Sequence, residues 1–463
     1  MRKSTKYIYA ALLLLTFSAC KKFLTVLPVD QVSDKVTIVD ATSAETAVRG
    51  VYRALAGGAT AVAGSATGTG TYYGGGFETF GYLPGDNIVW TGSQAVIQQF
   101  ISHTITSDNG NLETVWTGIY ATINGANQVI ANVPLVKDAS LTQAAQNQLT
   151  GEGYFIRALS YFDLARTWGG VPIVLTPTLT ATDKNGVTRS TLAQTYAQVL
   201  SDLNAADSLM SLPATQNPVR ANKETAWALK ARYYLYQKDW ANAEIYASKV
   251  IADSINYQLL QPYGAFFQPA SAIATKESVF ELSYNALYPN GSRSDWQPPA
   301  NGGTRQWAPN DSLVSLLNNP LIGGNRNVLI AQTSTGLWYG NLDYRSPATD
   351  PSYIIRIAEV YLIRAEARAE QSELPGALSD LNAIRSRAGL AASSAVAQPD
   401  ILLAIENENR IEFALEPHRW FDLVRTGRAQ AVLGITDPNQ LVFPLPLQEV
   451  NLSNGNLPQN PGY

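Results

Sequence analysis

Apolar residues recur with helical spacing in four stretches of the chain. In residues 151–170 they fall at steps of three and four, which places them on one face of a helix. Residues 190–210 repeat the pattern, and residues 223–251 and 358–390 each extend it over the length of two helices. The pattern predicts a chain that is largely α-helical.

The two longest stretches resemble each other. Each is expected to form two helices, with breaks near Lys238–Asp239 and Pro375–Gly376. Small residues recur at equivalent positions, as stacking of the tetratricopeptide type requires, because alanine lets helix backbones approach closely. Generic amphipathic helix pairs are the alternative. In the alignment, Lys230-Ala231 matches Arg364-Ala365, Ala243 matches Ala377, and Val250 matches Ile384; Arg157-Ala158 begins the same way, with Phe162 four residues after Ala158.

Two long segments interrupt the helical pattern. Residues 57–76 are nearly all Gly, Ala, Thr and Ser, a composition that predicts a mobile loop without a core. Residues 284–347 are rich in Pro, Gly, Asn, Trp and Tyr and show little periodicity. An irregular stretch of that length inside a compact domain is usually functional. We therefore expect helices to form a scaffold and the insertions to carry the binding face.

The first twenty residues have the order of a secretory signal. Arg2, Lys3 and Lys6 precede an apolar run of about ten residues, which is too short to span a bilayer. Small residues then lead to Cys20, the only cysteine of the chain, in an order that resembles the lipobox of bacterial lipoproteins. We interpret residues 1–19 as a signal peptide and Cys20 as the residue that carries the lipid. An ordinary signal peptide with an incidental cysteine is the alternative.

Composition narrows the classes of ligand. Removal of residues 1–19 leaves 30 basic and 37 acidic residues, a net charge of −7, and no basic stripe that would fit nucleic acid. Charged residues make up only 15% of the chain and aromatic residues 10%, which favours an uncharged polar ligand. A lipid on Cys20 would leave no thiol for a disulfide or a zinc site. No cofactor and no metal site are predicted.

No pattern for catalysis emerges. The chain has two histidines, His103 and His418, and lacks the common hydrolase, metalloprotease and phosphate-binding motifs. Glu408, Glu412 and Glu416 fall on one helix face among several arginines, which predicts a salt-bridged face instead of a catalytic pair. We predict no catalytic residues and a protein that is not an enzyme.

The tryptophans divide into two groups. Those in helical patterns are predicted to lie in the core, namely Trp116, Trp168, Trp227, Trp240 and Trp420. Those in segments of loop composition could stack on sugars, whose apolar faces need flat rings and whose hydroxyls need Asp, Asn, Gln or Arg. The alternative is that they pin the loops to the scaffold. With the polar residues near them, the predicted ligand-binding residues are Trp90, Asp86, Asn87, Trp296, Tyr288, Asp295, Arg293, Trp307 and Trp338.

Five motifs together resemble one family. They are "CKKFLTVLPVDQVSD", "YFIRALSYFDLARTWGGVPIV", "RIAEVYLIRAEA", "ENRIEFALEPHRWFDLVRTG" and "FPLPLQEVNLSNGNLPQNPGY". In this order, from Cys20 to Tyr463, they resemble the SusD/RagB family of outer-membrane lipoproteins of the Bacteroidetes. The chain departs from the family at Asn409, usually arginine, at Pro417, usually glycine, and at Val424, often arginine. Pro417 is expected to end its helix at Glu416.

The resemblance implies an all-α fold with about four tetratricopeptide-like helix pairs and an irregular binding region on one face. The implied division is a signal peptide at 1–19, a lipidated tether at 20–40 and a single domain at 41–463. Within that domain we expect helices mainly at 111–253 and 353–428, and the loop-rich binding region mainly at 57–105 and 257–350.

The resemblance also implies a function. A protein of this family is held in the outer membrane through its N-terminal lipid, faces the cell surface and captures a glycan. It delivers that glycan to a SusC-like TonB-dependent transporter, on which it sits as a lid; some members bind peptides. Two other functions stay open: a helical scaffold that grips a peptide or protein, and a glycoside hydrolase. The hydrolase would need two carboxylates about 5–10 Å apart across a cleft.

Overall fold

The structure is a computed structural model that describes residues 38–58, 71–180, 182–267 and 275–463. Cys20, the tether before residue 38 and residues 59–70 of the Gly-rich segment lie outside the described residues. The α-helices are α2 (Ala41–Arg53), α3 (Gly76–Tyr82), α4 (Ala95–Ile101), α5 (Gly110–Asn132), α6 (Gln143–Trp168), α7 (Leu192–Leu209), α8 (Lys223–Tyr236), α9 (Trp240–Ile251), α10 (Ser292–Trp296), α11 (Asp311–Asn318), α12 (Ile357–Glu370), α13 (Leu374–Arg387), α14 (Gln398–Glu412), α15 (Arg419–Arg425), α16 (Ala429–Leu433) and α17 (Leu447–Leu452). The strands are β1 (Ile88–Trp90), β2 (Ser278–Leu282), β3 (Trp307–Pro309), β4 (Ile330–Gln332), β5 (Trp338–Gly340) and β6 (Ser352–Arg356).

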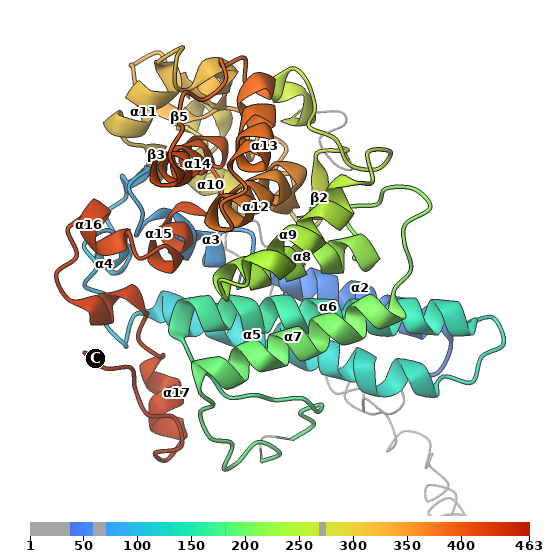
Figure 1. The fold of residues 1–463 in the computed structure, drawn as a ribbon. Coiled ribbons are helices and arrows are strands. Elements are labelled where there is room, and N and C mark those ends of the chain that lie inside the picture. The colour runs from blue at the N-terminus through green and yellow to red at the C-terminus, as the bar shows by residue number, and fades with distance from the viewer. Residues whose placement is uncertain (1–37, 59–70, 181, 268–274) are drawn as a thin grey trace, which may run out of the picture.

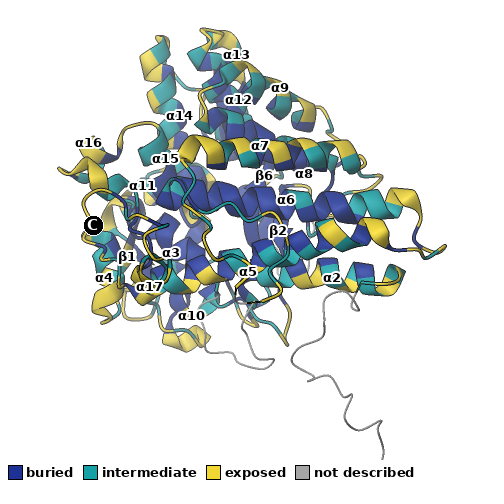
Figure 2. Cartoon of the chain, turned by 90° about the horizontal axis from the view of Figure 1, so that it is seen from below, coloured by how far each residue is buried: buried dark blue, intermediate teal, exposed yellow. Residues whose placement is uncertain are grey.

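Helix α6 is the central helix of the scaffold. It lies between α5 and α7, which run alongside it (Figure 1), and it is buried along most of its length (Figure 2). Its N-terminus is capped by the Thr142 hydroxyl, which accepts a hydrogen bond from the Ala145 amide, and its C-terminus ends at Gly169 with φ of 79°. The buried Arg157 of α6 pairs with Asp202 of α7 at 2.7 Å. A buried cation needs such a partner, so this pair fixes the register of the two helices.

The repeated positions are placed alike in both aligned helix pairs. Helix α8 packs on α9, α12 packs on α13, and α9 packs on α12, so the two pairs stack although a long insertion separates them. The aligned small and apolar residues are fully buried, with 0% exposure at Ala231, Ala365, Ala243, Ala377, Val250 and Ile384. The predicted all-α scaffold of stacked, tetratricopeptide-like helix pairs is confirmed.

Three details of the helical prediction were wrong. The break expected near Pro375–Gly376 falls slightly earlier, at residues 371–373, because proline is tolerated in the first turn of a helix and Pro375 lies in the first turn of α13. Helix α14 ends at Glu412 and not at Glu416, since Phe413 already leaves helical geometry with φ of −107° and ψ of 33°. Trp227 and Trp240, predicted as core, are only partly buried at the edge of the scaffold.

The ends of the Gly-rich segment also differ from the expected coreless loop. Tyr72 and Tyr73 are buried, and both hydroxyls donate to the Asp163 carboxylate of α6 at 2.7 Å. Gly74 and Gly75 adopt φ of 83° and 122° just before α3. Two adjacent tyrosines with a buried acceptor are enough to anchor a segment whose composition otherwise lacks core residues.

Within the described ranges the strands form three small antiparallel pairs, β1–β3, β2–β6 and β4–β5. The first of them matters most for the binding region, because it places Trp90 directly opposite Trp307. The early segment and the long insertion, more than 200 residues apart in sequence, therefore meet in one short sheet.

A network of buried ions joins the long insertion to the C-terminal helices. Glu412 accepts from Arg326 at 2.9 Å, from Arg356 at 2.9 Å and from Arg387. Burial alone would raise the pKa of Glu412, but the three guanidinium groups lower it to about 2. The predicted salt-bridged face is confirmed for Glu408, Glu412 and Glu416, although Glu416 lies beyond the end of α14.

Candidate functional site

Two pockets meet at Trp90, and together we call them the Trp90 groove. The inner pocket has a volume of about 170 Å³ and the outer pocket about 520 Å³. Trp90 and Gln94 line both, so the two pockets adjoin at the indole. The inner pocket is lined by Gly75, Gly76, Thr79, Trp90, Gln94, Val96, Ile97, Asn111, Thr114, Val115, Asp295, Gln306 and Trp307. The outer pocket adds Gly92, Ser93, Ala95, Gln98, Gln99, Ser102 and Thr104.

Trp90 is held from two sides. Strand pairing sets its backbone opposite Trp307, and the amide of the next residue, Thr91, donates to the Gln306 carbonyl at 2.8 Å. Its ring lies against the backbone of Gly92, where an added Cβ would overlap the indole. These contacts hold the ring in place. Because the ring is only half-buried, part of its surface remains open.

Replacing Gly92 with alanine should therefore displace the Trp90 ring. The backbone of Gly92 does not require a positive φ, so we expect the free energy of unfolding to change by less than about 1 kcal/mol. The affinity for the ligand that binds in the binding screen described below should fall by about tenfold, because the added methyl group pushes the indole out of its position between the pockets. Isothermal titration of Gly92→Ala measures this, with Gly50→Ala as a control, since an added Cβ at Gly50 meets nothing within 4 Å. Unchanged affinity in Gly92→Ala would contradict this account of the ring.

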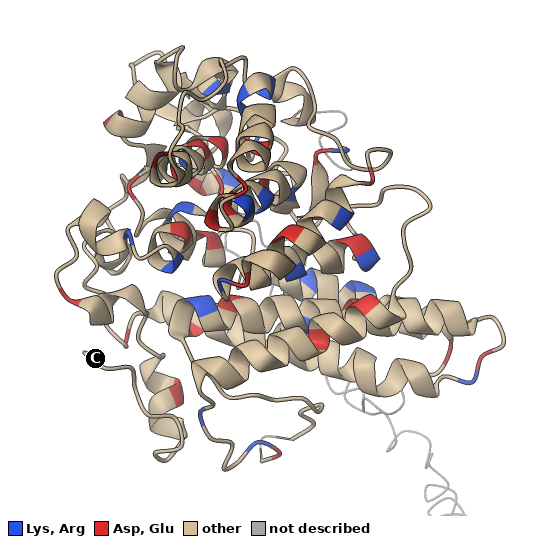
Figure 3. Cartoon of the chain, viewed as in Figure 1, with Lys and Arg blue, Asp and Glu red and all other residues tan. Residues whose placement is uncertain are grey.

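The groove is polar but almost without charge. Its side chains are mostly serine, threonine, glutamine and asparagine, and residues 87–107 contain no Asp, Glu, Lys or Arg. Figure 3 shows the same contrast, with charged positions gathered along α8, α9 and α12–α15 and the segment of α4 without any. Such a lining matches a ligand rich in hydroxyl groups and carrying apolar faces.

Asp295 is the exception in this lining. It is the one charged residue among the described residues that line the groove, and it is 7% exposed. Within the described part of the chain its carboxyl group forms no hydrogen bond and no ion pair. Burial raises its pKa to about 7.

The raised pKa of Asp295 makes a prediction about stability and pH. An unfolded aspartate has a pKa of about 3.9, so rising pH ionises the unfolded chain before the folded one and costs the wild type stability up to about pH 7. Asparagine avoids this loss. The stability difference in favour of Asp295→Asn should grow by on the order of 3 kcal/mol between pH 5 and pH 8. Urea unfolding at both pH values measures it, and a difference that stays constant would contradict the raised pKa.

The structure brings three of the predicted residues to the groove, namely Trp90, Asp295 and Trp307. Of these, Trp307 is 1% exposed, so only the edge of its side chain can face the pocket. Trp296 is 0% exposed and packs against Tyr82, Trp307 and Tyr344. A covered ring cannot stack on a sugar, so the expected stacking on Trp296 and Trp307 does not hold in this structure. These two tryptophans pin the insertion, the alternative that the sequence left open.

The side chains of Asp86 and Asn87 do not line the groove but contact the motif ENRIEFALEPHRWFDLVRTG at residues 408–427. The Asp86 carboxylate pairs with Arg419 at 2.6 Å and with Arg410 at 3.1 Å. The Asn87 amide exchanges hydrogen bonds with the side chain and carbonyl of Arg410. Both residues thus hold β1 on the scaffold, which positions Trp90 without contact to the ligand pockets.

The remaining predicted residues also have structural partners. Arg293 donates to the carbonyls of Asn301 and Gly302, which closes a turn of the insertion. The ring of Tyr288 lies under the Arg53 guanidinium at 3.9 Å. Trp338 is half-buried on β5 and does not line the groove.

Sequence reasoning missed most of the polar lining. The missed residues are Thr79, Gln94, Asn111, Thr114 and Gln306 of the inner pocket, and Ser93, Gln98, Gln99, Ser102 and Thr104 of the outer pocket. The one available signal was the uncharged, glutamine-rich run that follows Trp90.

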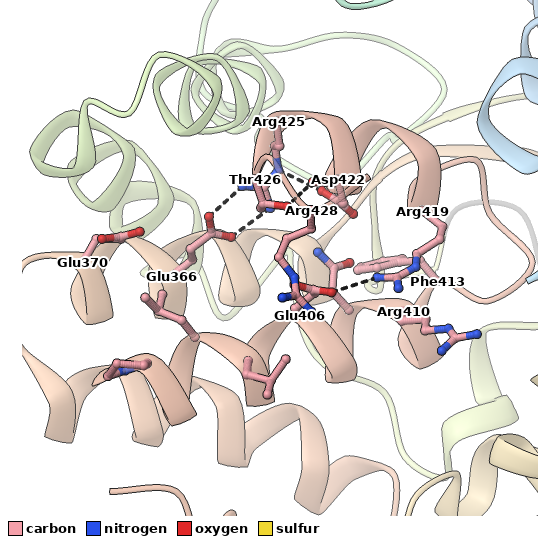
Figure 4. A pocket seen from close by; sticks show the side chains of 14 residues that line it. Glu366, Glu370, Glu406, Arg410, Phe413, Arg419, Asp422, Arg425, Thr426 and Arg428 are labelled. Carbon is pink, nitrogen blue, oxygen red and sulfur yellow. Dashed lines mark hydrogen bonds and ion pairs between the residues drawn. The ribbon is translucent and has the colours of Figure 1, made fainter. Parts of the chain in front are cut away.

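A separate pocket, of about 380 Å³, lies between α12, α14 and α15 and is lined by charged side chains (Figure 4). Arg425 pairs with Glu366 at 2.6 Å and with Asp422 at 2.9 Å. Across the pocket, Glu406 pairs with Arg419 and Arg428, at 3.4 Å and 3.1 Å. A ligand ion would have to break these pairs, so this pocket is a weaker candidate than the Trp90 groove.

Both histidines pack against aromatic rings of the scaffold. His418 stacks on Phe413 with ring centroids 4.4 Å apart, and burial together with nearby arginines holds its pKa well below the usual range. His103 stacks on Trp420 and its Nε2 atom lies 2.8 Å from the Pro84 carbonyl. The described residues contain no cluster of three or more His, Cys, Asp or Glu suited to a metal ion. Nor does any helix within the described ranges have the length and apolarity needed to cross a bilayer.

Comparison with known proteins places these features in one family. Residues 77–235 match a family described as "Starch-binding associating with outer membrane", and residues 339–440 match the SusD family. SusD-like protein P2 of Formosa agariphila is 27% identical over 423 residues, which cover 78% of this chain and 82% of that protein.

Solved structures agree in fold. A SusD superfamily protein of Bacteroides vulgatus aligns with a TM-score of 0.78 at 20% identity, over 91% of this chain and 99% of its own. A laminarin-binding SusD-like protein aligns with a TM-score of 0.75 at 23% identity, over 92% of this chain and 100% of its own. With the paired-helix scaffold, the C-terminal motif and both family matches in agreement, the chain belongs to the SusD/RagB family.

Proposed function

We propose that the protein binds a glycan in the Trp90 groove and does not cleave it. The observation that carries the proposal is the lining itself, in which a fixed, half-open indole stands between two pockets of uncharged hydrogen-bonding side chains. Sugars stack their apolar faces on such rings and exchange hydrogen bonds with amides and hydroxyls. The family description as starch-binding and the laminarin-binding neighbour support the same class of ligand.

The single carboxyl group in the described lining of the groove favours binding over hydrolysis. Glycoside hydrolysis requires two carboxyl groups on opposite sides of the scissile bond. Among the described lining residues Asp295 has no second carboxylate beside it. Specificity would then rest on affinity alone, set by the shape and polarity of the two pockets.

We propose further that the protein acts at the cell surface, anchored in the outer membrane. Cys20 carries the lipid, residues 21–40 form the tether, and the protein presents its glycan at the cell surface to a SusC-like TonB-dependent transporter. The family description of association with the outer membrane supports this location. The order apolar run, Ser18, Ala19, Cys20 supports the lipid anchor.

A binding screen tests the proposed ligand class. Protein that lacks residues 1–20 would be titrated with amylose, laminarin, mannan and xylan, and with a library of peptides for the alternative of a peptide-binding scaffold. We expect at least one neutral polysaccharide to bind and to remain uncleaved when the mixture is analysed for reducing ends. Binding of peptides without any polysaccharide would overturn the glycan proposal, and release of reducing ends would overturn the proposal that the protein only binds.

A further inference from the structure

The placement of Asp295 carries an inference about which glycans the groove accepts. Helix α10 begins at Ser292 and carries Asp295 in its first turn, and the segment holds its position because Trp296 is fully buried beside it. The carboxyl group lines the inner pocket, is 7% exposed, and forms no hydrogen bond or ion pair with the described residues. Trp90 lines the same pocket.

A buried carboxylate without a partner is unusual. Several buried carboxylates of the described residues are held by arginine; Glu412 has three arginine partners and Asp202 has one. Arg293, three residues from Trp296 in the same short helix, donates instead to the turn at Asn301 and Gly302. No basic side chain lines either pocket of the groove within the described residues. A negatively charged ligand group would therefore be repelled by Asp295, with no cation in the lining to offset the repulsion.

We infer that Asp295 makes the Trp90 groove select glycans by charge, so that it admits neutral sugars, binds sugars with a protonated amine more tightly and binds uronic acids more weakly. The inference rests on the proposed function and extends it to a class of ligand. A protonated amine supplies the partner that the carboxylate lacks, a hydroxyl supplies a hydrogen bond, and a sugar carboxylate brings a like charge into a poorly solvated site.

The test compares one sugar backbone in three charge states. Amylose and laminarin oligosaccharides would each be prepared unmodified, with C6 hydroxyls oxidised to carboxylates, and with C6 hydroxyls replaced by primary amines. Binding is measured by isothermal titration at pH 8, where Asp295 is ionised and a primary amine is still largely protonated. We expect the amine form to bind about tenfold more tightly than the neutral form, and the carboxylate form about tenfold more weakly.

Two variants locate the effect. Asp295→Asn should bring the three forms within about threefold of each other, because it removes the charge and keeps the shape of the side chain. Asp311→Asn removes the same charge from the exposed first turn of α11, outside the groove, and should leave the wild-type order unchanged. Loss of the order in both variants would point to the net charge of the protein and overturn the assignment to Asp295.

The outcomes separate this inference from the proposed function. If the neutral oligosaccharides bind in a manner that depends on Trp90 and the carboxylate forms bind equally well, the charge inference fails and the proposed function stands. If none of the forms binds, the charge inference is overturned, and the proposed function falls with it only if mannan and xylan also fail to bind in the screen. If the order amine, neutral, carboxylate appears in the wild type and disappears in Asp295→Asn alone, the inference is confirmed.

Discussion

Replacement of Arg356 by methionine is expected to lower the free energy of unfolding by about 3–5 kcal/mol. The Arg356 side chain is fully buried and pairs with Glu277 at 3.0 Å, with Glu412 at 2.9 Å and with Glu416 at 2.6 Å. Removal of the cation leaves carboxylates buried with too few partners, which costs more than the pairs themselves contribute. Urea unfolding monitored by circular dichroism measures the loss.

A surface pair of the same chemistry provides the control. Arg428 pairs with Glu406 at 3.1 Å, but 46% of its side chain is exposed. Arg428→Met should therefore change the free energy of unfolding by less than about 1 kcal/mol. Equal effects in the two variants would show that the buried network does not hold the insertion on the C-terminal helices.

Replacement of Trp90 by alanine is expected to weaken glycan binding by about 30-fold or more, the effect of losing a contact worth about 2 kcal/mol. Trp90 is the half-open aromatic ring that lines both pockets, and its loss removes the stacking surface from the middle of the groove. The effect is measured by isothermal titration with the neutral polysaccharide that binds in the screen.

Trp338→Ala is the matched control for Trp90→Ala. Trp338 is also half-buried and also lies on a short strand of the loop-rich region, but it does not line the groove. Its replacement should change affinity by less than about twofold. A loss of binding in Trp338→Ala with little change in Trp90→Ala would move the site away from the Trp90 groove.

The scaffold could be predicted because its information is local. Apolar spacing in residues 151–170 marks a helix face without knowledge of any partner, and the aligned alanines of the two repeats, such as Ala243 and Ala377, are all buried. Boundaries were less predictable. Pro375 can either end a helix or begin one, and only the packing of α13 on α12 decides between them.

The site was only partly predictable because its geometry depends on contacts across long stretches of chain. Asp86 looked like a ligand contact, but its partners Arg410 and Arg419 lie more than 320 residues away in sequence. Trp296 and Trp90 occur in segments of similar composition, yet one is fully buried and the other is half-open. Their difference follows from which rings the β1–β3 pair and Tyr82 cover, and no local pattern records that.

The central claim is that a neutral glycan lies on Trp90. It is tested most directly by ¹⁹F NMR of protein labelled with 5-fluorotryptophan, in which Trp90→Phe assigns one of the nine tryptophan signals. On addition of the polysaccharide that binds in the screen, the Trp90 signal should shift strongly, while the signals of the scaffold tryptophans Trp168 and Trp227 should stay in place. A Trp90 signal that does not move while another tryptophan signal shifts would contradict the account.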